Sequence, residues 1–236
     1  MPPATRIVAG MDLDAEAAPP RGLYASLVKR GIDAVVAGVL MIVLLPVMAL
    51  VWLAVRLVLG APALHRDVRA GLRGRPIRIA KFRSMREARG SDGQLLPDAA
   101  RLGSFGRLLR RTSLDELPQL ASVVVGDMSL VGPRPLPERY VPRYSARQAT
   151  RLLVRPGLTG WAQIHGRNAV AWPERLEYDA EYVDLLRRPA APLVDLWILV
   201  ATVFQVVGQA FTGRGVAAPG CVTMEEFLPD ERPATP

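Results

Sequence analysis

The sequence predicts a mainly α fold with a small β element, attached to a membrane by an N-terminal helix–break–helix and by amphipathic interfacial helices. The first observation is an uncharged run of 22 residues, 34–55, which is long enough to enter a bilayer because crossing takes about 20 apolar residues. The second is the helical spacing of apolar residues in 99–109, 114–125 and 175–186. The third is the strand-like alternation of apolar and polar residues in 77–82.

Pro46 lies near the middle of the uncharged run. A proline inside a helix removes a backbone hydrogen bond and crowds the preceding turn, so a kink or break is expected there. Lys29 and Arg30 precede the run and Arg56 follows it, and positive charges favour the cytoplasmic side at both ends. A re-entrant helix–break–helix over 25–60, entering and leaving by one face, satisfies both features. An ordinary spanning helix with a tolerated proline is the alternative.

A second apolar stretch, 194–211, contains Asp195, Gln205 and Gln209. These polar residues favour a helix lying in the membrane interface over a second spanning helix. The two ends of the chain are rich in proline and glycine, which is typical of loosely ordered tails. We therefore expect a flexible N-terminal tail (1–24) and a re-entrant membrane hairpin (25–60). A main domain that includes the interfacial helix (61–212) and a flexible C-terminal tail (213–236) would follow.

The positive charge of the chain is concentrated in one segment. The whole chain carries a net charge of +8, whereas residues 56–111 hold fourteen Lys or Arg and four acids. Such a block binds phosphate in nucleotides, nucleic acid or lipid headgroups. Its place directly after a membrane-length run favours lipids and nucleotides, and no nucleic-acid-binding module is evident. One cysteine, Cys221, excludes an internal disulfide, and with only two histidines a His/Cys zinc site is not expected.

Two adjacent carboxylates, Asp115 and Glu116, follow the end of this basic segment at Arg110 and Arg111. With Ser113 they match a capping box, so the pair could serve only to start a helix. The helix dipole and the two arginines are expected to keep Asp115 ionised at neutral pH. An ionised, fixed carboxylate can ligate Mg²⁺ or attack phosphorus.

Two further segments offer groups that bind anions. Arg134 lies between Pro133 and Pro135, which restrict the backbone around its guanidinium; a rigid linker with a solvated arginine is the alternative. The glycine-punctuated stretch 155–168 offers backbone amides to an anionic or ribose-bearing ligand. Trp161 within it could stack on a base or fill the core. The polar side chains of that stretch are Arg155, Gln163, Arg167 and Asn168.

In order and spacing, these motifs resemble the bacterial sugar transferase family, the small monotopic polyprenyl-phosphate phosphoglycosyl transferases. The resemblance covers about residues 27–199, and the chain has the size of the minimal form of the family. It departs from the family at Leu45, where serine often precedes the hairpin proline. The matching segments are 29–33, 81–85, 114–120, 126–135, 156–161 and 175–179 with Tyr182 and Val183.

The resemblance implies a two-step reaction on a membrane-associated catalytic domain. Asp115 would attack the sugar-linked phosphate of a nucleoside diphosphate sugar, with uridine as the expected nucleoside, and release UMP. Polyprenyl (undecaprenyl) phosphate would then attack the phosphosugar ester on Asp115. Glu116 would assist with metal or proton handling, and Mg²⁺ would lie against Asp115. The product, polyprenyl-diphosphate-sugar, would begin exopolysaccharide, O-antigen or glycoprotein glycan assembly.

The resemblance also implies the partners and the location. We expect a nucleotide sugar, polyprenyl phosphate and membrane lipids as partners, no nucleic acid, and the cytosolic face of a bacterial inner membrane. The oligomeric state and the sugar are not indicated. A non-catalytic basic membrane scaffold is the alternative, disfavoured because Asp115, Glu116 and Arg134 are intact. The candidates for phosphate contact are Lys81, Arg83, Arg110, Arg111, Arg134, Arg155 and Arg167.

Overall fold

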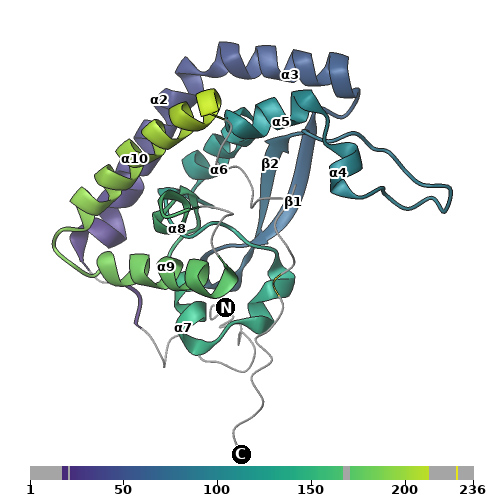
Figure 1. Ribbon diagram of the computed structural model, residues 1–236. Coiled ribbons are helices and arrows are strands. Elements are labelled where there is room, and N and C mark those ends of the chain that lie inside the picture. The colour runs from purple at the N-terminus through teal and green to yellow at the C-terminus, as the bar shows by residue number, and fades with distance from the viewer. Residues whose placement is uncertain (1–17, 21, 167–170, 213–226, 228–236) are drawn as a thin grey trace, which may run out of the picture.

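The computed structural model describes residues 18–20, 22–166, 171–212 and 227. It is mostly helical with two small two-stranded sheets, as the sequence predicts. The three long apolar helices, α2, α3 and α10, cover one side of the molecule, and the sheets and shorter helices lie beneath them (Figure 1). Of the two expected tails, the structure describes residues 18–20, 22–24 and Phe227, and the rest lies outside the described residues.

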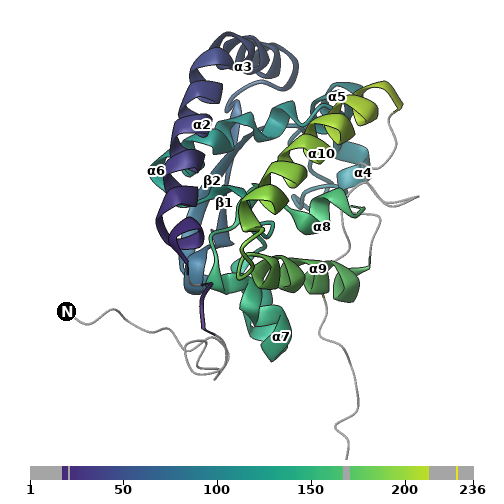
Figure 2. The same cartoon turned by 90° about the vertical axis from the view of Figure 1, so that its left-hand side faces the viewer.

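The expected helix–break–helix is present. A π-helical turn, η1 (Tyr24–Val28), leads into α2 (Lys29–Val43), and α3 (Leu45–Leu59) follows at a bend of 61°. Figure 2 shows α2 rising along one edge of the molecule and α3 turning away at the top. The break falls at Leu44 (φ −89°, ψ 0°), and Pro46 lies in the first turn of α3, where its missing N–H leaves no hydrogen bond unmade.

Helix α10 (Ala191–Thr212) is the one helix of the described part of the chain that is by itself long and apolar enough to cross a membrane. Its inward face carries a stripe at helical spacing that includes Asp195, Ile198 and Gln209, all buried. Its other faces expose large apolar side chains such as Trp197 and Phe204. A helix with one polar stripe packed on the domain and an exposed apolar surface is amphipathic, as predicted.

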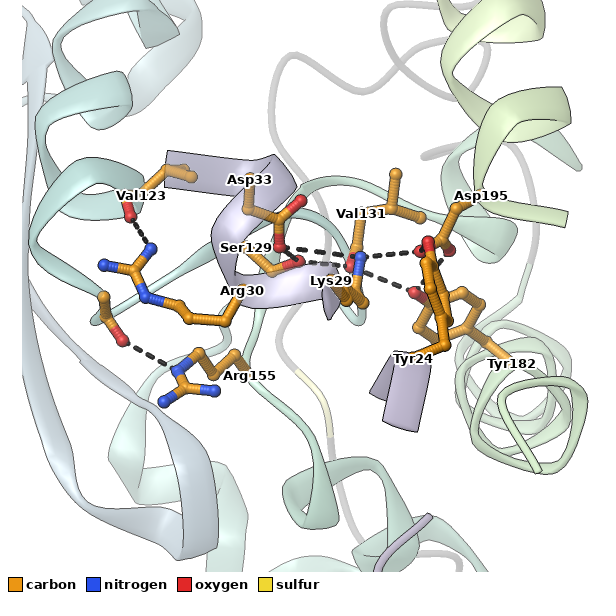
Figure 3. A network of polar contacts seen from close by, with 11 residues as sticks. Tyr24, Lys29, Arg30, Asp33, Val123, Ser129, Val131, Arg155, Tyr182 and Asp195 are labelled. Atoms are coloured by element: carbon orange, nitrogen blue, oxygen red, sulfur yellow. Dashed lines mark hydrogen bonds and ion pairs between the residues drawn. The ribbon is translucent and has the colours of Figure 1, made fainter. Parts of the chain in front are cut away.

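A buried polar network fastens the start of α2 to the rest of the molecule (Figure 3). Lys29 Nζ lies 2.7 Å from Asp195 Oδ2, and Tyr182 donates to the other oxygen of that carboxylate at 2.8 Å. Ser129 Oγ donates to Asp33 Oδ2 at 2.5 Å, and Arg30 donates to the Val123 carbonyl at 2.7 Å. Because buried charges need partners, this network fixes the position of the start of α2 on the rest of the molecule.

The first sheet is an antiparallel hairpin of β1 (Leu64–Ala70) and β2 (Pro76–Phe82), joined through η2 (Leu72–Gly74). The sequence predicts β2, but β1 was missed because charged residues hide its alternation. The second sheet pairs β3 (Ser129–Val131) in parallel with β4 (Gly157–Thr159).

The segment 133–135 after β3 is not a free linker. Pro133 accepts a hydrogen bond from Gly157 N at 2.9 Å, and Gly132 N donates to Thr159 O at 2.8 Å. A Cβ atom on Gly160 would lie 2.1 Å from the Gly132 carbonyl oxygen, so only glycine permits this approach.

The helices between and after the strands are short except for α9 and α10. The predicted helix 99–109 is divided at Gly103, whose backbone is extended. The main core cluster gathers Leu120, Met128, Tyr182 and Ile198 from four segments. The helices are α4 (Asp98–Arg101), α5 (Ser104–Arg111), η3 (Leu114–Gln119), α6 (Leu120–Val125), η4 (Glu138–Arg143), α7 (Ala146–Ala149), η5 (Thr150–Leu153), α8 (Trp161–Ile164) and α9 (Trp172–Leu185).

Candidate active site

The carboxylate pair sits in a tight 3₁₀ turn and not at a capped α-helix start. Ser113 adopts left-handed dihedrals (φ 56°, ψ 16°), and its side chain makes no capping hydrogen bond. The turn closes instead through the backbone, with Glu116 N donating to Ser113 O at 3.1 Å. The capping box expected from the sequence is therefore wrong, because a left-handed residue cannot hold the extended geometry that an N-cap needs.

Glu116 is bound by Arg134. The two guanidinium Nη atoms lie 2.5 and 3.4 Å from the two carboxylate oxygens, the two-pronged geometry typical of arginine with a carboxylate. Glu116 is also the main cause of the raised pKa of Arg134. The pairing of β3 with β4 holds segment 133–135 in place, and Arg134 within it thereby contacts Glu116 of the carboxylate pair.

Asp115 is buried, with 8% of its surface exposed, and accepts no hydrogen bond from any described residue. Burial, and then the neighbouring Glu116, raise its pKa to about 6, although the charges of Lys81, Arg110 and Arg134 oppose the shift. The expectation from the sequence took in only the helix dipole and the arginines, which favour the ionised form, because desolvation cannot be read from neighbouring residue types. The carboxyl is still mostly ionised at pH 7, one unit above this pKa.

Two more predicted cations reach the pair. Lys81, at the end of β2, has its pKa lowered by burial and by Arg134. The pKa of Arg110, on α5, is also lowered by burial, and its Nε donates to Ser84 Oγ at 3.1 Å. The negative charges of Asp115 and Glu116 act against the lowering of both pKa values. Lys81 and Arg110 are therefore close enough to the carboxylate pair to interact with it electrostatically.

Two predicted phosphate contacts, Arg83 and Arg155, are not brought to the pair. Arg83 donates to the carbonyls of Leu59, Gly60 and Ala61, where it closes the end of α3. Arg155 Nε donates to Gly126 O at 2.9 Å, and Gly126 caps the C-terminal end of α6; Figure 3 shows the Arg155 side chain. Both arginines satisfy helix-end carbonyls that would otherwise lack donors.

The other two candidates have no observed place in the site. Arg111 has a buried Nε without a hydrogen-bond partner, and it is not among the main charges that shift Asp115. Arg167, like Asn168, lies outside the described residues. Trp161 is half-buried against the main core and donates from Nε1 to Glu181 at 3.1 Å, which favours its core interpretation.

Three buried residues at the site were not among the predicted site residues. Arg151 Nη2 donates to the Arg134 carbonyl at 2.6 Å, and its Nε and Nη2 both bind Asp179 Oδ2, at 3.1 and 2.8 Å. Arg175 lies one helical turn before Asp179, and burial followed by the charge of Arg134 lowers its pKa to about 10. Arg175 and Asp179 lie four residues apart in the family-matching segment 175–179, and this spacing was a usable signal. Arg151 offered none.

The site holds more positive than negative charge. Among the residues that the structure describes, the cations Lys81, Arg110, Arg134, Arg151 and Arg175 outnumber the carboxylates Asp115, Glu116 and Asp179. A concentration of positive charge attracts anions, so such a site favours an anionic ligand.

The described residues contain no group of three His, Cys, Asp or Glu side chains that could hold a metal by themselves. Mg²⁺ often binds through one or two carboxylates together with substrate phosphates. Asp115 fits that requirement, since its carboxylate is the uncommitted member of the pair.

Comparison with known proteins identifies the family. The model of the bacterial sugar transferase family matches residues 24–209. The chain belongs to this family. The match confirms the resemblance found in the sequence and, with it, an enzyme of the sugar transferase class. Every described residue of the site lies within the matched region.

Individual bacterial sugar transferases are similar over most of this chain. "Uncharacterized sugar transferase EpsL" of Bacillus subtilis is 48% identical over 173 residues, 73% of this chain and 82% of the relative. A UDP-glucose:undecaprenyl-phosphate glucose-1-phosphate transferase of Caulobacter vibrioides is 40% identical over 78% of this chain and 70% of its own. The Escherichia coli protein of that name is 37% identical, but the match covers only 40% of its length.

Proposed function

We propose that this bacterial sugar transferase moves a sugar phosphate from a UDP-sugar to undecaprenyl phosphate, through a phosphosugar ester on Asp115. The contrast within the carboxylate pair carries the proposal. Glu116 is held by Arg134, whereas Asp115 is buried and uncommitted among three cations. Relatives named for UDP-glucose and undecaprenyl phosphate support the two substrate classes.

In the first step, an Asp115 oxygen attacks the phosphorus that carries the sugar. The bond between that phosphorus and the bridging oxygen breaks, and UMP leaves with the electron pair. In the second step, a phosphate oxygen of undecaprenyl phosphate attacks the same phosphorus, and the Asp115 carboxylate leaves. Lys81, Arg110 and Arg134 would stabilise the charge that gathers on the phosphoryl oxygens in both steps.

Mg²⁺ would be held by Asp115 and by the substrate phosphates, and it would neutralise part of the diphosphate charge when bound. Glu116 serves a separate purpose in this proposal. By pairing with Arg134 it orients the guanidinium and keeps the neighbouring Asp115 free. It also raises the pKa of Asp115, which makes the carboxylate a stronger base.

The membrane arrangement we propose is re-entrant, with the domain of 61–212 on the cytosolic face of the inner membrane. Both ends of the helix pair are fastened to that same domain. Lys29 at the start of α2 binds Asp195, and the carbonyls at the end of α3 accept from Arg83. A helix pair that starts and finishes on one domain enters and leaves by the same face. The exposed apolar side chains of α2, α3 and α10 would contact lipid.

The test is UMP release from a panel of UDP-sugars by the full chain in detergent, with and without undecaprenyl phosphate. We expect one sugar to support turnover, and Asp115→Asn to lower it at least about 1000-fold, as for loss of a nucleophile. Asp92→Asn, on an exposed loop, is the matched control and should leave turnover unchanged. No UMP release with any sugar would favour the scaffold alternative, and an active Asp115→Asn variant would exclude Asp115 as the nucleophile.

A further inference from the structure

Phe227 is buried although it lies within the segment expected to be a flexible tail. Only 5% of its surface is exposed. Its ring centroid lies 5.4 Å from that of Trp172, 5.7 Å from that of Tyr140 and 6.0 Å from that of Tyr144. Arg143 donates to its backbone carbonyl. We call Tyr140, Tyr144 and Trp172 the aromatic cage, and Phe227 fills it.

Two walls of the aromatic cage hold arginines of the active site. The Tyr144 hydroxyl accepts from Arg151 Nη1 at 2.9 Å, and the Arg151 guanidinium lies 5.5 Å from the Tyr144 ring centroid. The Arg175 guanidinium lies 5.4 Å from the Trp172 ring centroid. Each wall therefore has Phe227 against it and an active-site cation bound to it.

The two arginines in turn border Arg134. Arg151 donates to the Arg134 carbonyl at 2.6 Å, and the charge of Arg134 lowers the pKa of Arg175. A continuous set of contacts thus runs from Phe227 through the aromatic cage to the arginine that holds Glu116. A cation above an aromatic face is held most strongly when water is excluded, and the buried Phe227 ring packs against both of these aromatic rings.

We propose that Phe227 is a positioning residue of the active site, which orients Arg151 and Arg175 for the diphosphate of the nucleotide sugar. This inference rests on the proposed function. Loss of the Phe227 ring would open space beside Tyr144 and Trp172, and the side chains of a core relax only partly into such space. The two guanidinium groups would then be held less firmly, and the anionic substrate would bind more weakly.

The experiment compares full-chain variants in steady-state kinetics with the UDP-sugar accepted by the wild type. Phe227→Ala should raise KM for that sugar about tenfold, which corresponds to the loss of one desolvated cation–π contact, with kcat changed less than about twofold. Phe227→Tyr, which keeps the ring, should restore KM to near the wild-type value. UMP binding, measured by calorimetry, should be weaker in Phe227→Ala than in the wild type and close to the wild-type value in Phe227→Tyr.

The control is Val141→Ala, which removes buried side-chain volume from the same apolar cluster without altering an aromatic ring. It should lower the melting temperature and leave KM within about twofold. Equal KM values for Phe227→Ala and the wild type, or an equal rise in Val141→Ala, would overturn the inference. If Phe227→Ala does not fold, Phe227→Leu replaces it and should raise KM about threefold. Inactive wild-type protein would instead refute the proposed function, and UMP calorimetry would still rank the variants.

Discussion

Arg134 and Glu116, 18 residues apart in the chain, form a two-pronged ion pair at the centre of the candidate active site. This pair separates the roles of two adjacent carboxylates. Glu116 is committed to a guanidinium, and Asp115 beside it has no hydrogen-bond partner in the described part of the chain. Glu116 and Asp115 differ in this way because the β3–β4 pairing places segment 133–135, and with it Arg134, beside Glu116. A substitution of Arg134 is therefore the first test.

Arg134→Lys should lower kcat/KM about 100-fold or more, because a lysine cannot make the two parallel contacts of a guanidinium with Glu116. Arg147→Lys, which alters an exposed ion pair with Glu177, is the matched control and should be close to neutral. The measurement is UMP release at several concentrations of the nucleotide sugar. Wild-type kcat/KM in Arg134→Lys would show that the two-pronged geometry has no catalytic importance.

The pH dependence of kcat/KM should report the raised pKa of Asp115. Because the ionised carboxylate is the attacking form, activity should be half-maximal near pH 6, close to its plateau from about pH 7, and fall about tenfold per unit well below pH 6. Glu116→Gln removes the second-largest cause of the shift, so the acid limb should move to lower pH. An acid limb near pH 4 in the wild type would contradict this assignment.

Asp179→Asn should destabilise the fold by about 3–5 kcal/mol, since it leaves the buried Arg151 guanidinium without its anionic partner. Glu177→Gln provides the comparison, because the Arg147 pair that it breaks is exposed and is worth about 1 kcal/mol or less. Denaturant unfolding in one detergent measures both. Similar effects from the two variants would mean that burial of the Arg151 pair adds nothing to its strength.

A phosphosugar should accumulate on Asp115 when the acceptor lipid is withheld. We expect a burst of UMP at about one equivalent per active site, and an Asp115 peptide heavier by one sugar phosphate in mass spectrometry. Chelation of Mg²⁺ should abolish the burst. Rapid UMP release without any adduct would point to direct transfer between the two substrates.

Local patterns were sufficient to predict much of this protein from its sequence. The uncharged run 34–55, the break close to Pro46 and the polar interruptions of 194–211 depend on hydrophobicity and backbone chemistry within one segment, and the structure has a bent helix pair and an amphipathic helix there. The motif order was enough to identify the family. Lys81, Arg110 and Arg134 were three of the seven candidates for phosphate contact, and the sequence did not distinguish them from the other four.

Only the tertiary structure decided which arginines face the site and which close helices. Arg83 and Arg155 have the same chemistry as Arg134, but their guanidinium groups donate hydrogen bonds to the carbonyls at the ends of α3 and α6. The tertiary structure also decided the direction of the Asp115 pKa, because burial depends on segments distant in sequence. Asp115 and Glu116 are adjacent in the chain, and their different roles come from Arg134, which tertiary contacts alone bring to one of them.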